Sequence, residues 1–239
     1  MRWYIGRTIS KISELGGVDD DFLVQASESI QKKFRLVNYH SDKSKTSLYN
    51  SITDNDWKAV NLASAYFGSM ATWSSLSEEE INNAVKNVFE SEAHIESFAS
   101  QLHSIADNLS VLVYWAIPYV QNKIGDQSKV SIYKVRDSLE LHHEALKKEI
   151  VRLTEMYEYQ YLVAFTNLGK HQSLVDRSFV CNFETDEEHP HQVVFKSFVY
   201  KKNTYDSIKA FEFTDNYGRK IKEQYLRIGA TLERELSNG

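Results

Sequence analysis

The stretch SEEEINNAVKNVFESEAHIESFASQLHSIADNLSVLVYWAI, residues 77–117, decides the fold class of this chain. It opens with Ser77 and Glu80, whose three-residue spacing is typical of a capping box at the start of a helix. Apolar side chains then recur at steps of three and four residues, the period of an amphipathic helix: Val85, Val88, Phe89, Ile95, Phe98, Leu102, Ile105, Leu109 and Leu112. The pattern predicts one long helix over Ser77–Ile117, which Pro118 ends or kinks.

A second stretch with helical periodicity covers Ile132–Leu168, where apolar residues recur from Val135 to Phe165. The polar connector between the two stretches, Asn122–Lys129, is short, so the two long helices should pair antiparallel. The 239 residues contain only two prolines and nine glycines, which favours long helices over a many-stranded sandwich. We therefore predict a mainly α fold, a helical bundle around a long antiparallel helix hairpin, with a small β-hairpin before the last helix.

The rest of the chain predicts shorter elements around this hairpin. Apolar spacing indicates helices over Arg2–Leu15, Asp20–Phe34 and Asp56–Trp73, and the polar stretch Asn38–Asn55 predicts a surface loop. Beyond Leu174, Phe179, Cys181 and Phe183 stand at alternate positions, and Val193–Tyr200 is β-branched and aromatic, so a β-hairpin is predicted within residues 178–200. A terminal helix is predicted over Tyr205–Leu236, with Gly218 as an interruption.

The length fits one domain, which we expect to cover residues 1–239. Within it, the sequence pattern separates amino-terminal helices and a loop (1–75), the helix hairpin (77–174), the β-hairpin (178–200) and the terminal helix (205–236). A single cysteine, Cys181, cannot form an internal disulfide, and neither a leader sequence nor a membrane span is predicted. We expect a cytoplasmic protein with no membrane contact, and the net charge of −5 argues against a broadly basic nucleic-acid coat.

The strongest functional signal lies where the second long helix ends. Asn167, Lys170 and His171 place an amide, an ammonium and an imidazole within five positions. A neutral imidazole can take a proton from a hydroxyl while an ammonium stabilises developing negative charge, which is the minimum for cleaving a phosphodiester without a metal. In the alternative interpretation Gly169 ends the helix, and Lys170 and His171 only complement its negative end.

His103 and Asp107 lie four residues apart on the first long helix, so they share one face. The carboxylate could orient the imidazole and raise its basicity, or the pair could be a buried polar contact that fixes the helix register. If antiparallel packing brings this pair beside His171, the three residues form one site. A metal enzyme that uses His103, Asp107 and His171 is a further hypothesis.

The residues around position 170 resemble the HEPN superfamily of helical bundle proteins, which are common in bacterial toxin–antitoxin and anti-phage systems. Its motif is an arginine, a polar residue such as Asn, and a His four to six residues after the arginine. Asn167 and His171 match this spacing, but Thr166 occupies the arginine position. Arg136 followed by His142 or His143 also fits an arginine-then-histidine spacing of four to six intervening residues, in a charged helix where such spacings arise by chance.

The chain is also similar to a group of bacterial helical proteins with Leu-His-Ser-x-Ala-Asp and Asn-x-x-Lys-His-Arg motifs, an aromatic β-hairpin and an Ile-Gly-containing last helix. The matching residues are Leu102–Asp107, Asn167–His171, Phe198–Tyr200 and Ile228–Gly229, while Gln172 stands where the second motif has arginine. The resemblance covers about Glu92–Leu236.

The resemblance implies catalytic roles for His171 as acid/base, for Asn167 as its polar companion, and for Lys170 as a substitute for the missing positive charge. We expect four further residues to contribute to binding of the RNA or protein partner: His103, Asp107, Gln172 and Arg177. We expect no metal or other cofactor. The implied protein is a homodimer from a bacterial defence or toxin–antitoxin system that binds RNA or a protein partner, with metal-independent RNA cleavage as one hypothesis. The alternative is a non-catalytic structural or regulatory subunit of a protein complex.

Overall fold

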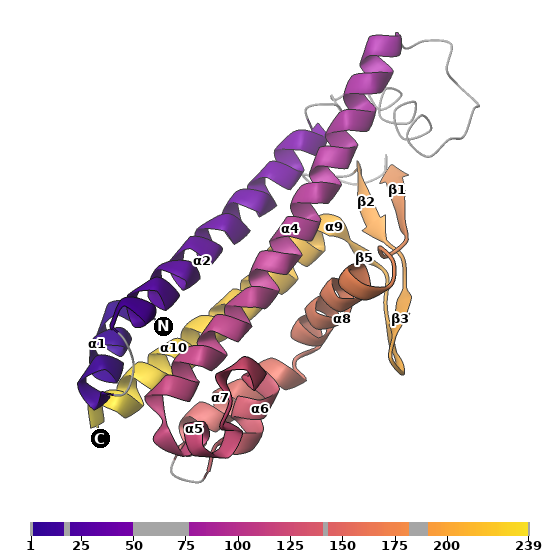
Figure 1. The fold of residues 1–239 in the computed structure, drawn as a ribbon. Coiled ribbons are helices and arrows are strands. Elements are labelled where there is room, and N and C mark those ends of the chain that lie inside the picture. Colours follow the sequence, from indigo (N-terminus) through magenta and orange to yellow (C-terminus); the bar gives the residue numbers. More distant parts are fainter. Residues whose placement is uncertain (1, 17–19, 50–76, 141–142, 182–190, 239) are drawn as a thin grey trace. The chain divides into compact units, whose positions relative to one another are not determined.

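The computed structural model describes residues 2–16, 20–49, 77–140, 143–181 and 191–238, and helices dominate them (Figure 1). The mainly α fold is therefore confirmed. By its internal contacts the chain divides into two compact units. Unit 1 comprises Met1–Leu36, Ser100–Val163 and Tyr217–Gly239, and unit 2 comprises Val37–Ala99 and Ala164–Asn216. None of the described helices combines the length and the apolarity that crossing a lipid bilayer would require.

The long helix predicted from residues 77–117 is confirmed as α4 (Glu78–Ala116). The capping box is formed, because the Glu80 amide donates to Ser77 Oγ at 3.2 Å and the Ser77 amide donates to Glu80 Oε2 at 3.0 Å. The helix ends before Pro118, which is the first residue of the next helix, α5 (Pro118–Ile124). A single 3₁₀ turn, η2 (Gln127–Lys129), follows in the connector.

The single long helix predicted over Ile132–Leu168 is wrong, because this stretch forms three helices. These are α6 (Ile132–Ser138), α7 (Glu144–Glu155) and α8 (Tyr157–His171). The breaks lie at Leu139 and Met156, whose ψ angles of 133° and 134° are extended rather than helical. Neither residue is a glycine or a proline, so the sequence gives no breaker signal at these positions.

At the amino-terminal end, α1 (Ile5–Leu15) confirms the first predicted helix, and α2 (Asp20–Tyr49) continues well beyond the predicted end at Phe34. The loop predicted from Asn38 is therefore wrong as far as Tyr49. In this part of α2 the buried face consists mainly of serines, Ser41, Ser44 and Ser47, together with Leu48. Ser91 of α4 donates to the Ser44 carbonyl at 2.6 Å, which shows how closely the two helices approach within unit 2. The helix predicted over Asp56–Trp73 lies outside the described residues.

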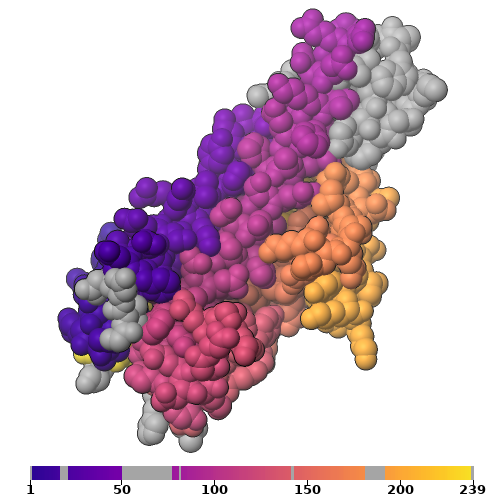
Figure 2. Space-filling model, viewed as in Figure 1, coloured from indigo at the N-terminus to yellow at the C-terminus, as the bar shows by residue number. Residues whose placement is uncertain are grey.

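Unit 1 is organised around the last helix, α10 (Gly218–Asn238), which is drawn in yellow in Figure 1. Tyr225 on this helix is fully buried, and its hydroxyl donates to the Leu102 carbonyl of α4 at 3.0 Å. The Tyr225 ring also meets Tyr159 edge-on at 6.4 Å. The short helices α5, α6 and α7 pack on one another, and Figure 2 shows their side chains as a continuous rose-coloured surface.

Unit 2 contains the β structure. Strand β1 (Arg177–Cys181) pairs antiparallel with β2 (His191–Phe195), as the hairpin prediction required, and β5 (Ile208–Lys209) adds to the other edge of β2. The predicted strand Val193–Tyr200 is divided, however, because β3 (Phe198–Tyr200) pairs with β4 (Asn203–Tyr205) in a separate hairpin. Phe183 lies outside the described residues.

An aromatic cluster holds the helices and strands of unit 2 together. Phe195 of β2 meets Phe165 of α8 edge-on at 4.9 Å, and Phe213 contacts both Phe165 and Phe98. Phe213 begins a π-helical turn, η4 (Phe213–Tyr217), which follows the single turn α9 (Ala210–Glu212). The terminal helix predicted over Tyr205–Leu236 is therefore confirmed from Ala210 onward, and the π-helical turn interrupts its α-helical geometry directly before Gly218.

Candidate functional site

The last turn of α8 holds the predicted catalytic residues. The helix continues through Gly169 to His171, so Gly169 does not end it, and Asn167 and His171 lie one turn apart. Lys170 and His171 do lie in the last turn of the helix, as the structural interpretation expects. A Cβ on Gly169 would meet only Leu174, at 3.8 Å, so ordinary helix packing surrounds this position. Beyond the helix, the amides of Gln172 and Ser173 both donate to the Leu168 carbonyl, at 2.9 and 3.2 Å.

The polar side chains of this turn are accessible. Lys170, His171 and Gln172 are exposed, and Asn167 is half-buried. Within the described ranges, no hydrogen bond or ion pair ties the side chain of Asn167, Lys170 or His171. All three lie at the carboxyl end of the helix, where a positive charge is favoured by the helix dipole. The turn therefore presents an amide, a cation and an imidazole that remain available to a ligand.

Thr166, which occupies the position of the family's arginine, is buried with 6% of its surface exposed. It lies on the side of α8 that faces the core of unit 2, beside Phe165 with 7% exposed. The nearest exposed cation in the sequence is Lys170. The exposed positive charge of this turn therefore lies at a different position from the arginine of the HEPN motif.

Arg177, which we expected to bind, is held in ion pairs at the start of β1. Its Nε lies 3.0 Å from Oε1 of Glu92, and its Nη1 lies 3.4 Å from Oε1 of Glu96, both on α4. The Glu92 side chain is only 2% exposed, so the guanidinium compensates a carboxylate that has lost its water. The contacts of Arg177 thus fix β1 to α4 within unit 2.

His103 and Asp107 belong to unit 1, whereas the turn at the end of α8 belongs to unit 2. His103 is half-buried and Asp107 is exposed. The neighbouring Asn108 accepts from Lys33 Nζ at 3.1 Å. Burial lowers the pKa of Lys33, and the negative charge of Asp107 partly opposes this shift. Asp107 therefore acts on the polar contacts between α2 and α4, and a site shared with His171 stays a prediction.

Arg136 and His143, which also fit the arginine-then-histidine spacing of four to six intervening residues, make contacts that hold helices together. Arg136 donates through Nε to Asp137 at 2.8 Å and through Nη1 to Thr154 at 3.2 Å. His143 Nδ1 lies 2.8 Å from Glu235 of α10, and the same carboxylate accepts from the Leu146 amide at 3.1 Å. Arg136 therefore links α6 to α7, and Glu235 caps the start of α7. His142 lies outside the described residues.

No pattern in the sequence predicts a pair of histidines that the structure brings together in unit 2. Nδ1 of His40 on α2 lies 2.9 Å from Nδ1 of His94 on α4. The ring centroids are 5.2 Å apart, so the two nitrogens point towards each other, and only one of them can carry a proton. Burial, and then the charge of His94, lower the pKa of His40. A contact between residues 54 positions apart on different helices leaves no trace in local spacing.

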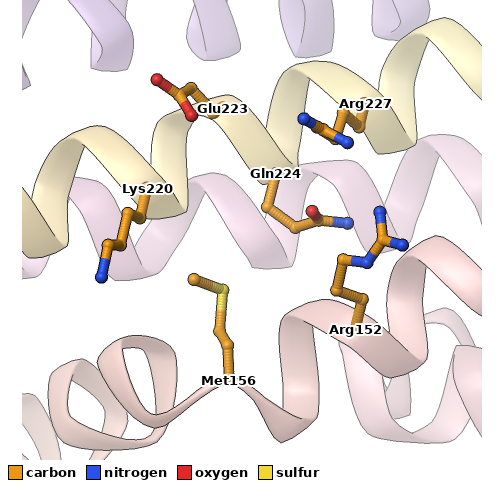
Figure 3. A pocket seen from close by; sticks show the side chains of 6 residues that line it. All are labelled: Arg152, Met156, Lys220, Glu223, Gln224 and Arg227. Carbon is orange, nitrogen blue, oxygen red and sulfur yellow. The ribbon is translucent and has the colours of Figure 1, made fainter.

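Unit 1 has a polar groove of about 350 Å³ between α10 and the break that separates α7 from α8 (Figure 3). Figure 3 shows Arg152 and Arg227 extending into it beside Gln224. Much of its charge is already paired, because Lys220 lies 2.6 Å from Glu158 and Arg152 lies 3.2 Å from Glu149. Gln224 Nε2 also donates to Glu149, at 2.8 Å. The polar residues around the groove therefore form mainly a network of ion pairs and hydrogen bonds that joins α7, α8 and α10.

In the part of the chain that the structure describes, no three His, Cys, Asp or Glu side chains come together as metal ligands would. The chain matches no protein-family model, no curated protein and no solved structure.

Proposed function

We propose that this chain is a HEPN-like RNA-binding protein and that the last turn of α8 cleaves RNA without a metal. The observation that supports this proposal is the state of Lys170 and His171. Both side chains are exposed, and within the described residues neither is bound to another side chain. By contrast, Arg177, six positions after His171, is tied to Glu92 and Glu96. A catalytic group must reach its substrate, and the side chains of Lys170 and His171 have this freedom whereas Arg177 does not.

The chemistry follows from the three side chains. Neutral His171 takes the proton of a ribose 2′-hydroxyl, the 2′ oxygen bonds to the phosphorus, and the bond from phosphorus to the 5′ oxygen breaks. Lys170 stabilises the negative charge that grows on the phosphoryl oxygens. Asn167, one turn earlier on the same face, can hydrogen-bond the ribose or the phosphate. The departing 5′ oxygen needs a proton from a second acid, which His171 of a second copy supplies if the protein acts as a homodimer.

A second candidate is a non-catalytic RNA- or partner-binding subunit. The observation that favours it is Thr166, because the family's arginine position is occupied by a buried, uncharged side chain. Lys170 carries a compact charge without the planar fork of an arginine, so it holds a phosphate less specifically. In both candidates we propose a role in a bacterial defence or toxin–antitoxin system.

The test uses the purified protein, a fluorescent single-stranded RNA and excess metal chelator. We expect cleavage by the unmodified protein and a loss of at least about 100-fold in the His171→Gln variant, because general base catalysis typically contributes that much. Lys170→Ala should also be slow, whereas Lys202→Ala, which removes an exposed cation of the same unit, should cleave normally. Melting temperatures should match in all variants.

The alternatives give different results. RNA binding that Lys170→Ala weakens, without cleavage by the unmodified protein, would support the non-catalytic candidate. If the unmodified protein neither binds nor cleaves the RNA, both candidate functions are refuted. Growth arrest on expression in bacteria, relieved by His171→Gln, would support the toxin role.

A further inference from the structure

Unit 1 contains a second cleft, of about 300 Å³, between the residues that lead into α1 and the last turns of α10. Three arginines line it, Arg2, Arg7 and Arg234, against one carboxylate, Glu233. The whole chain carries a net charge of −5, so a gathering of arginines is not a consequence of general basicity. This cleft needs its own explanation.

The one carboxylate is already occupied. Glu233 Oε2 accepts from the Tyr4 amide at 3.0 Å, and Oε1 lies 3.9 Å from Nη1 of Arg7. Only 14% of the Glu233 side chain is exposed. Among the described residues, neither Arg2 nor Arg234 has a carboxylate partner, and Arg234 donates only to the Thr231 hydroxyl, at 3.2 Å. Two guanidinium groups at this cleft therefore have no carboxylate partner within the part of the chain that the structure describes.

Tyr4 orders the arginines. The guanidinium carbons of Arg2 and Arg7 lie 5.0 and 4.7 Å from the centroid of its ring, and 44% of the Tyr4 surface is exposed. Stacking on an aromatic ring holds the planar group in place and leaves its N–H edge free to donate. Less side-chain entropy is then lost when an anion binds.

The segment that carries Arg2 and Tyr4 is itself anchored. Trp3 packs directly on Gly229 of α10, where a Cβ would overlap the ring, and Trp3 Nε1 donates to Thr8 at 2.9 Å. The arginines on either side of the cleft are therefore attached to elements with a fixed separation.

We propose that this cleft binds a phosphate group, carried by a single-stranded nucleic acid or by a free nucleotide. The guanidinium fork matches the oxygens of a phosphate, and the exposed Tyr4 ring beside it suits the base or sugar that such a ligand carries. The inference goes beyond the proposed cleavage, because it concerns residues of unit 1 and needs no reaction at His171.

The experiment measures binding of three probes to the full chain: a fluorescent single-stranded RNA, a nucleoside triphosphate and inorganic phosphate. We expect Arg234→Gln and Arg2→Gln each to weaken binding by about tenfold, since a charge-assisted hydrogen bond contributes at least that much. Arg219→Gln is the matched control, because Arg219 lies on the same helix, is exposed, is paired with Glu223 and does not line the cleft.

The probes distinguish the two sources of phosphate. A nucleic-acid strand is identified by tight RNA binding in which the slope of the logarithm of the binding constant against the logarithm of the salt concentration becomes shallower by about 0.7 in each arginine variant. The reason is that each neutralised phosphate of a single strand releases counterions. Tight nucleotide binding with weak RNA binding identifies a free nucleotide. The proposal is overturned if the unmodified protein binds none of the probes, or if Arg219→Gln weakens binding as much as Arg234→Gln does. Because two probes cannot be cleaved as RNA, the result does not depend on the proposed RNase activity.

Discussion

Replacing Gly229 by alanine should separate α1 from α10. Gly229 lies within α10, where alanine would ordinarily favour the helix by about 1 kcal/mol. An added Cβ would, however, overlap three carbon atoms of the Trp3 ring, Cδ2, Cε2 and Cε3. The ring cannot simply turn aside, because its Nε1 is bound to the fully buried Thr8. The variant therefore gains a clash at the contact that attaches α1.

The magnitude follows from two opposing effects. Overpacking of a filled site costs about 1–3 kcal/mol, and a clash with an anchored ring falls at the upper end of that range. Higher helix propensity returns about 1 kcal/mol. We expect the free energy of unfolding to fall by about 2 kcal/mol.

The assay is urea denaturation followed by far-UV circular dichroism. Gly6→Ala is the control, because a Cβ on Gly6, in α1, meets nothing within 4 Å, so this variant should be slightly more stable than the unmodified protein. In a Trp3→Ala background the clash is absent, and Gly229→Ala should then stabilise. The reasoning is refuted if Gly229→Ala is as stable as Gly6→Ala in the otherwise unmodified chain.

Two further predictions concern unit 2. Arg177→Ala should lower the free energy of unfolding by roughly 3 kcal/mol, because Glu92 would remain buried without its cation, and Glu92→Leu added to Arg177→Ala should recover much of the loss in urea denaturation. Because the pKa of folded His40 lies below its ordinary value of 6.5, the unfolded chain takes up a proton first, and stability should fall as the pH drops below about 6.5. His40→Gln should flatten this dependence in urea titrations at several pH values, and an unchanged slope would contradict the role of the histidine pair.

The sequence predicts those elements whose signals are local. Helix α4 has a capping box, an apolar face and a terminal proline within one continuous segment, and the structure confirms the capping box and the proline. The apolar face is buried from Ile95 to Leu112, whereas Val85 and Phe89 near the start of the helix are exposed. The spacing of Phe179 and Cys181 that predicts a strand is equally local, and β1 confirms the strand. Such elements need no knowledge of the rest of the chain.

The extension of α2 shows a different situation. Its carboxyl-terminal part is polar, so a search for apolar periodicity predicts a loop. The helical period is present, but in serines, since Ser41, Ser44 and Ser47 follow one another at three-residue steps on the buried face. Small side chains let the backbone of α4 approach, as the bond from Ser91 to the Ser44 carbonyl shows. Only knowledge of the partner helix distinguishes this face from a polar loop.

The breaks between α6, α7 and α8 could not be predicted either, because their support comes from side chains elsewhere. A helix end leaves carbonyl groups without partners. Lys147 Nζ donates to the Leu139 carbonyl at 2.9 Å, and Gln160 Nε2 donates to the Thr154 carbonyl at 3.2 Å. These bonds replace the helical ones that the extended residues Leu139 and Met156 remove.

The candidate site was predictable to a similar degree. The sequence located Asn167, Lys170 and His171 because they lie within one turn, and the helix does continue through them. The ion pairs of Arg177 and the contact of His40 with His94 join positions far apart in the chain, so local sequence spacing cannot predict them.

The position of α10 in unit 1 has a consequence for synthesis of the protein. Glu233 bonds to the Tyr4 amide across 229 positions, and Tyr225 bonds to Leu102 across 123. The helix that joins these earlier segments is therefore translated after all of them. During translation, the apolar faces of α1 and of the first half of unit 1 therefore stay exposed to solvent until α10 has been synthesised. Contacts of such long sequence separation also form slowly. Cells that produce this protein should depend on chaperones during the interval before α10 emerges.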